Sequence, residues 1–134
     1  MANVTSIQTL VDGPRNVVIK YDGILDTSDV SSTTLIDPGS LSAIDVNNTL
    51  PTKVRIDRVF FDVEDGLAVY LYWDATTPVR IAELAGRGKM YAGKYGGLTN
   101  NAGAGKTGKV LVATQGWSAG TTLSFTLILE CVKQ

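Results

Sequence analysis

The chain has 134 residues, the size of one ordinary domain. It carries 12 basic and 13 acidic residues, and this balance argues against the strongly basic surface of a dedicated nucleic-acid binder. The absence of His and the presence of one Cys exclude His-based catalytic triads, His-containing zinc sites and internal disulfides. We therefore expect no enzymatic activity, no cofactor and no structural metal.

The N-terminal segment has no clear hydrophobic period. Residues 1–14 carry scattered apolar side chains and end in the turn sequence Asp12-Gly13-Pro14. We expect an N-terminal arm that packs on a neighbour or lies along the sheet, followed by a single domain at residues 15–134. The sequence shows no signal peptide and no apolar stretch near the roughly 20 residues of a membrane-spanning helix, so no membrane partner is expected.

Most of the remaining chain reads as short β-strands. Alternating and β-branched residues predict strands at 16–21, 33–37 and 79–84, and residues 40–45 fit a helical turn or a loop. Turn signals recur every 8–12 residues, which is typical of a sandwich or a barrel.

Two pairs of strands are predicted as hairpins. Residues 52–63 and 67–74 flank Asp65-Gly66, a good type I′ turn signal, and the alternation slips near Asp57-Arg58, where we expect a bulge. Residues 109–114 and 123–132 are joined by a turn-rich segment. The fold class predicted is all-β: a single antiparallel β-sandwich, jelly-roll-like, with seven to eight strands and no helix of ten residues.

The most unusual segment is rich in glycine and lysine. Residues 86–108 hold eight of the 14 glycines together with Arg87, Lys89, Lys94 and Lys106. The pattern G-x-G-x-x-G also occurs here, but a strand follows it, whereas a nucleotide-binding loop must open a helix. We expect a mobile basic loop that orders against an acidic partner.

Three aromatic residues are candidates for an interface. Tyr70 and Tyr72 lie on the strand face opposite Val69 and Leu71, so this second face should also be covered, within the chain or by another subunit. Trp117 lies in a glycine-bounded loop and is either a plug over the end of the sandwich or an interface anchor. Carboxylates at residues 57–74 fit exposed strands and turns better than a metal site.

Parts of the sequence resemble small proteins encoded among the virion genes of tailed bacteriophages. The resemblance rests on segments 9–18 (TLVDGPRNVV), 71–78 (LYWDATTP), 86–90 (GRGKM) and 95–103 (YGGLTNNAG). It implies a virion protein assembled in the host cytoplasm, of the kind that decorates (cements) capsids and commonly forms trimers. The partners implied are the major capsid protein and further copies of the chain, with no nucleic acid or membrane. A tail, neck or head-fibre protein and a carbohydrate-binding module remain as alternatives.

Overall fold

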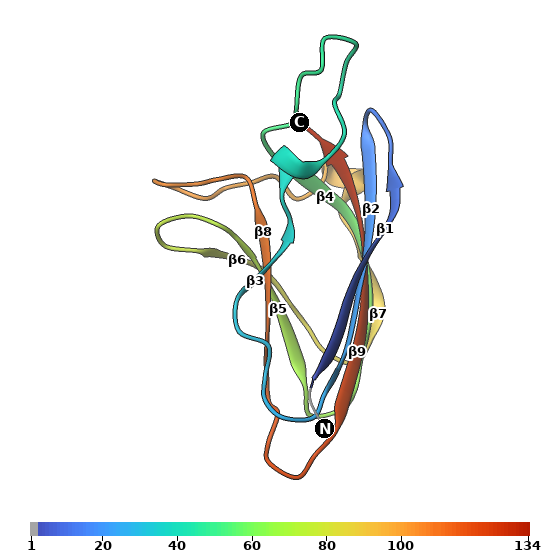
Figure 1. The fold of residues 1–134 in the computed structure, drawn as a ribbon, viewed down its shortest axis with the longest axis vertical. Helices are drawn as coiled ribbons and strands as arrows, with labels where there is room; N and C mark the ends of the chain where they lie inside the picture. Colours follow the sequence, from blue (N-terminus) through green and yellow to red (C-terminus); the bar gives the residue numbers. More distant parts are fainter. Residues whose placement is uncertain (1–2) are drawn as a thin grey trace.

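The computed structural model describes residues 3–134 as two antiparallel sheets packed face to face (Figure 1). The five-stranded sheet has the spatial order β1 (Val4–Asp12), β2 (Asn16–Leu25), β9 (Leu123–Lys133), β4 (Val54–Val63) and β7 (Arg87–Tyr91). The four-stranded sheet has the order β3 (Thr33–Ile36), β8 (Val110–Gln115), β5 (Ala68–Trp73) and β6 (Val79–Leu84). Two short 3-10 turns, η1 (Pro38–Ser40) and η2 (Gly93–Tyr95), complete the described elements.

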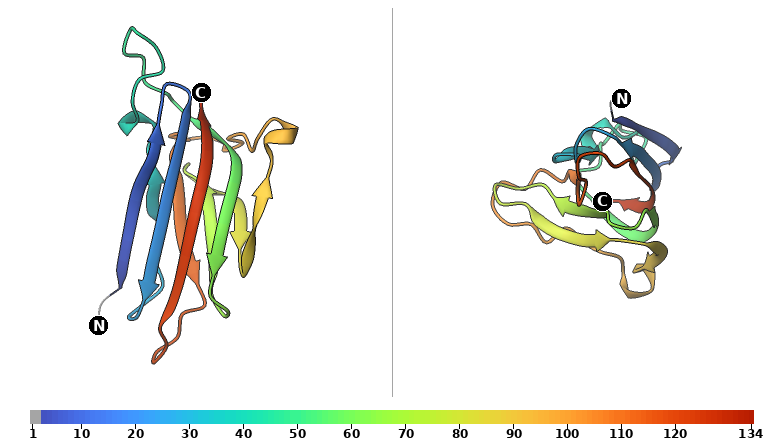
Figure 2. Two further views of the ribbon diagram at one scale, coloured as in Figure 1. Left: turned by 90° about the vertical axis from the view of Figure 1, so that its right-hand side faces the viewer. Right: turned by 90° about the horizontal axis from the view of Figure 1, so that it is seen from below.

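The strand order is that of a jelly roll with one added strand. The sheet β2-β9-β4-β7 faces the sheet β3-β8-β5-β6, and from β2 onward the chain changes sheet at every connection except β5–β6. Strand β1 extends the first sheet at its edge, as the face-on view in Figure 2 shows. The all-β, jelly-roll-like sandwich is confirmed. The expected count of seven to eight strands is too low, because the described chain has nine: β1 and β7 lie in segments for which the sequence predicts an arm and a loop.

Both predicted hairpins are wrong, because the paired strands belong to different sheets. Strand β4 pairs with β7 and β9, whereas β5 pairs with β6 and β8. The turn between β4 and β5 therefore crosses from one sheet to the other. Gly66 alone has a positive φ there, of 88°, and Asp65 does not, so the turn is not type I′. Strands β8 and β9 are likewise in opposite sheets, since β9 pairs with β2 and β4.

The N-terminal segment is a strand and not a free arm. Residues 4–12 run antiparallel to β2, from Val4 opposite Ile24 to Asp12 opposite Val17, with a register shift around Leu10. Of the two arrangements expected for the arm, the structure has the one along the sheet. No alternation marks this strand because all nine of its residues are exposed.

The segment 86–108 is only partly a loop. Its first residues form β7, which pairs with β4, and η2 follows before the chain becomes irregular. The expected bulge near Asp57 is confirmed, since the β4–β9 register shifts between Ile56 and Arg58.

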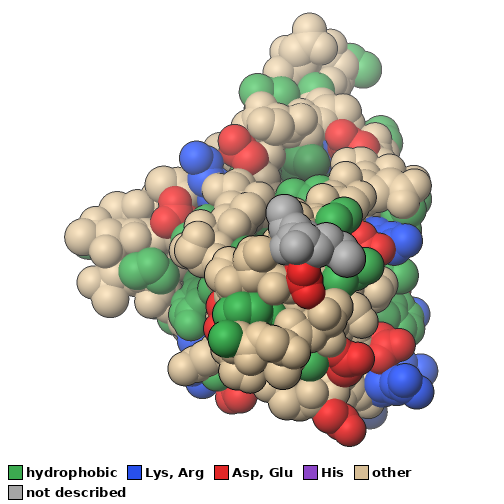
Figure 3. Space-filling view, turned by 60° about the horizontal axis from the view of Figure 1, so that its bottom comes forward, with side chains coloured by type: hydrophobic (Ala, Val, Ile, Leu, Met, Phe, Trp, Pro, Cys, Tyr) green, Lys and Arg blue, Asp and Glu red, His purple; other side chains and the backbone are tan. Residues whose placement is uncertain are grey.

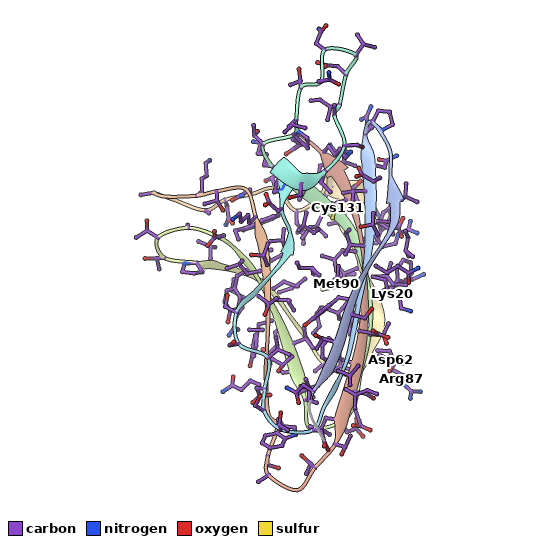
Figure 4. The ribbon with its side chains drawn as sticks, viewed as in Figure 1. Lys20, Asp62, Arg87, Met90 and Cys131 are labelled. Carbon is purple, nitrogen blue, oxygen red and sulfur yellow. The ribbon has the colours of Figure 1, made fainter. Side chains whose placement is uncertain are left out.

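The core lies between the two sheets and is filled mainly by inward residues of β2, β4, β5, β8 and β9. Trp73 on β5 and Ile56 on β4 are almost fully buried, and the rings of Tyr21 and Phe125 meet with centroids 5.3 Å apart. Figure 4 places Cys131 and Met90 between the sheets and Lys20, Asp62 and Arg87 on the outer side of the five-stranded sheet. The candidate site lies on this sheet and on the segments attached to it.

Candidate contact surface

Large hydrophobic side chains are exposed on the five-stranded sheet and on segments next to it. Among the described residues these are Val4, Ile7, Leu10, Val11, Ile24, Val46, Leu50, Tyr91 and Tyr95. Five belong to β1 and β2, two to the loop before β4, and two to β7 and η2. All nine therefore lie on the five-stranded sheet or on segments attached to it, and none lies on β3, β5, β6 or β8.

The loop between η1 and β4 projects beyond the end of the sandwich (Figure 1). Its tip is ordered by local hydrogen bonds: the Asp45 carboxylate accepts from the backbone N–H of Asn47 and Thr49, at 2.9 and 3.1 Å, and Ile44 N–H donates to the Thr49 carbonyl. These backbone bonds lower the pKa of Asp45. Val46 is 97% exposed at this tip. The loop thus presents an apolar side chain on a hydrogen-bonded turn.

The base of this loop is held by a buried lysine. The side chain of Lys133, near the C-terminus, is fully buried. Its ammonium group donates to the Asp12 carboxylate, to the Gly13 carbonyl at 2.6 Å and to the Ser42 carbonyl at 2.9 Å. These contacts join the β1–β2 turn, the projecting loop and β9 at one point.

A stack of cationic and aromatic side chains crosses the outer face of the five-stranded sheet. The guanidinium of Arg58 lies 4.7 Å from the ring centroid of Tyr91 and 5.7 Å from that of Phe60, and it forms an ion pair with Glu130 at 3.6 Å. A shallow hollow of about 370 Å³ lies between this stack and Val11. Figure 3 shows acidic and basic side chains next to one another along this side.

The four predicted basic residues do not share one surface. Arg87 and Lys89 belong to β7, where Arg87 pairs with Asp62 at 3.0 Å, and the Lys94 ammonium lies 5.8 Å from the Tyr95 ring centroid on η2. Lys106 lies in a loop bonded to the β5–β6 turn, on the opposite side of the molecule from β7 (Figure 1). The single basic loop predicted from the sequence is therefore divided between two places.

Tyr70 and Tyr72 are half-buried on the outer face of the four-stranded sheet, the side away from the exposed hydrophobic residues. The Tyr70 hydroxyl donates to Gln115 at 3.0 Å, and the Arg80 guanidinium lies 4.7 Å from its ring centroid. Tyr72 packs beside Tyr70, with ring centroids 6.4 Å apart. Contacts with neighbouring side chains thus cover part of both rings.

Trp117 closes one end of the sandwich. It is half-buried against the core, its indole N–H donates to the Thr121 carbonyl at 3.0 Å, and its backbone N–H donates to Asp29. This packing fits the plug arrangement, and a role of Trp117 as an interface anchor stays a prediction. The polar edge of the ring is satisfied within the chain.

Side chains arranged for metal binding or nucleophilic chemistry are few in the described chain. Within residues 3–134 no three His, Cys, Asp or Glu side chains gather closely enough to hold a metal ion. Burial raises the pKa of the Cys131 thiol to about 12. No helix in this part of the chain is long and apolar enough to cross a bilayer.

Comparison with known proteins gives little further information. No protein-family model matches the chain, and no curated protein matches it in sequence. Among solved structures, the crystal structure of FeII HppE superposes with a TM-score of 0.36 and 14% identity, covering 93% of this chain and 50% of that chain. The chain thus spans about half the length of that protein, and a similarity at this level supports no inference about function.

Proposed function

We propose that the chain is a structural protein of a bacteriophage virion, which decorates the capsid shell and acts through protein–protein contacts. One observation carries the proposal: within residues 3–134, the large exposed hydrophobic side chains all lie on the five-stranded sheet or its attached segments. Soluble monomers rarely leave extended apolar patches uncovered. A side of this kind fits a protein that works in contact with other subunits.

The projecting loop is the segment best suited to reach the capsid protein. Its tip is fixed by the Asp45 hydrogen bonds and its base by Lys133 and Ser42. A segment that is already ordered loses little conformational entropy on binding. Insertion of the exposed Val46 into an apolar pocket of the capsid protein would therefore cost little and bury the side chain.

Weak contacts suffice for a decoration protein because the shell repeats them. Many identical sites on a symmetric lattice raise the effective concentration of each further contact. Lys89 on β7 provides positive charge that would speed encounter with an acidic surface, whereas the charge of Arg87 is offset by its ion pair with Asp62. Self-association, expected from the sequence as a trimer, stays a prediction.

The test uses particles made with and without this protein. Particles that lack it should release their genome at a lower temperature than complete particles, and adding purified protein should restore the difference. Val46→Asp protein should fail to restore it, since a charge at the tip cannot enter an apolar pocket. Thr77→Asp, a change at another exposed position, in the β5–β6 turn, is the matched control and should restore it fully.

Equal heat stability of the two kinds of particle would contradict the decoration role. If such particles also failed to attach to cells, a host-surface binding role would replace it.

A further inference from the structure

We infer that β1 is an interface between two copies of the chain: the free edges of two β1 strands pair antiparallel about a two-fold axis and join two five-stranded sheets into one. The inference deepens the proposed function and rests on the self-association expected there, with a two-fold dimer in place of the expected trimer. It names the strand, the register and the symmetry of that contact.

The edge of β1 differs from the other three sheet edges of the described chain. Edge strands expose unpaired backbone groups, and proteins usually protect them with charges, short length or irregularity. Strand β3 has four residues, β6 carries Arg80 and Glu83, and β7 carries Arg87 and Lys89. Strand β1 has nine residues and, before its final Asp12, no charge at all.

The exposure of apolar side chains on β1 to water is energetically unfavourable. Every residue of the strand is exposed, and Val4, Ile7, Leu10 and Val11 keep between 44% and 57% of their surface accessible. A six-residue stretch, from Val4 to Thr9, pairs with β2 in continuous register before the shift around Leu10. This stretch is regular enough to accept a further strand on its free edge.

The sequence of this stretch is complementary to itself. In an antiparallel pair centred on Ile7, Ile7 lies opposite Ile7 of the second copy, Thr5 opposite Thr9, and Ser6 opposite Gln8. Isoleucine then faces isoleucine and threonine faces threonine, and no two charges of the same sign face each other. Pairs of this kind stabilise adjacent strands. A register centred on Ser6 would place Val4 opposite Gln8 and Thr5 opposite Ile7, which is a poorer match.

The surroundings of Ile7 leave room for the partner side chain. Ile7 lies opposite Tyr21 of β2, so it points to the side of the sheet that faces the core. A hollow of about 450 Å³ lies beneath it, between β1 and residues 28–33. A two-fold axis at Ile7 brings the second isoleucine to the mouth of this hollow. Because such an interface is formed by the same patch on both copies, it closes as a dimer.

Disulfide trapping of purified protein tests the register directly. Directly opposite residues in an antiparallel pair have Cα atoms about 4.5–5.5 Å apart, within reach of a disulfide. Ile7→Cys protein should therefore form a cross-linked dimer under mild oxidation. The controls Ser6→Cys and Ile24→Cys should cross-link about tenfold more slowly, since Ser6 meets its copy only diagonally, roughly 7–8 Å away, and Ile24 lies on the next strand.

Mixing two variants gives a second test of register. Ser6→Cys and Gln8→Cys chains should cross-link to each other faster than either does alone. The buried Cys131 stays out of these reactions.

Sedimentation gives the independent readout. Wild-type protein should sediment as a dimer, Ile7→Lys as a monomer because two like charges face each other at the axis, and Ile24→Lys as a dimer. A wild-type monomer or trimer, or equal cross-linking at all three positions, would overturn the inference. The protein is tested without capsids, so failure here leaves the proposed attachment to the shell untouched.

Discussion

Lys133 and Asp12, which are 121 residues apart in the sequence, form an ion pair at the end of the sandwich from which the projecting loop leaves. The Lys133 side chain is fully buried, whereas that of Asp12 remains 27% exposed. Ser42 donates to the same carboxylate through its backbone N–H and its hydroxyl. The fold thus fixes its projecting loop through a single buried cation.

The unequal burial of the pair predicts unequal effects of mutation. Asp12→Ala leaves the Lys133 charge buried without its counter-ion and should lower the free energy of unfolding by about 3 kcal/mol. Lys133→Met leaves Asp12 in contact with water and should cost less. Urea denaturation of both variants measures the difference, and a larger loss for Lys133→Met would contradict the arrangement.

The same carboxylate predicts a dependence of stability on pH. Burial raises the pKa of Asp12, but hydrogen bonds from Lys133 and Ser42 outweigh burial and hold the pKa below its usual value. Its contribution is therefore complete above the unfolded-state pKa of about 3.9, and it is lost as the pH falls through the lower folded-state pKa. In urea titrations between neutral and acid pH, Asp12→Asn should lose less stability than wild type. Equal losses would show that Asp12 contributes nothing to the fall in stability at acid pH.

Deletion of residues 1–14 is now expected to damage the fold. The deletion removes β1, which covers one edge of β2, together with the counter-ion of Lys133. Circular dichroism should show a lower melting temperature for the truncated protein. A truncated protein as stable as the full chain would mean that β1 is a dispensable arm after all.

The thiol of Cys131 should be inert in the folded protein. It is 2% exposed, and burial raises its pKa to about 12, so almost no thiolate is present at neutral pH. Titration with a thiol-specific chromogenic reagent should give no reaction in buffer and one equivalent in denaturant. Rapid reaction without denaturant would place the residue outside the core.

Gly108 is predicted to be intolerant of any side chain. Its φ is 85°, and a Cβ there would overlap the carbonyl oxygen of Thr52. Gly108→Ala should therefore destabilise the protein by more than about 1 kcal/mol. Gly103→Ala, in the same loop with open space around it, is the control and should be nearly neutral. Similar denaturation midpoints for the two variants would contradict the close approach of these segments.

Local sequence patterns predict where the strands lie better than they predict which strands pair. The alternation from Leu123 to Cys131 correctly indicates which side chains of β9 are buried, because a strand in a sandwich buries every second residue. The turn signal at Asp65-Gly66 predicts a hairpin, but a short turn can either join strands in one sheet or cross between two sheets. Only tertiary packing separates these outcomes.

The candidate surface was harder to predict than the fold. Strand β1 has no burial period because neither of its faces is covered, so all of its residues are exposed. The contact between Lys133 and Asp12 joins the two ends of the chain, and nothing local to either residue signals it. The basic residues of the glycine-rich segment were grouped by sequence proximity, whereas the pairing of β7 with β4 separates Arg87 and Lys89 from Lys106.

The central claim, that the chain is a virion structural protein whose five-stranded side makes the contacts, is tested most directly by an electron-microscopy reconstruction of purified particles. The account predicts density for this jelly roll on the capsid, with the loop that carries Val46 against the capsid protein and β1 against a second copy. Particles without such density, or density at the tail tip with the five-stranded sheet facing solvent, would contradict it.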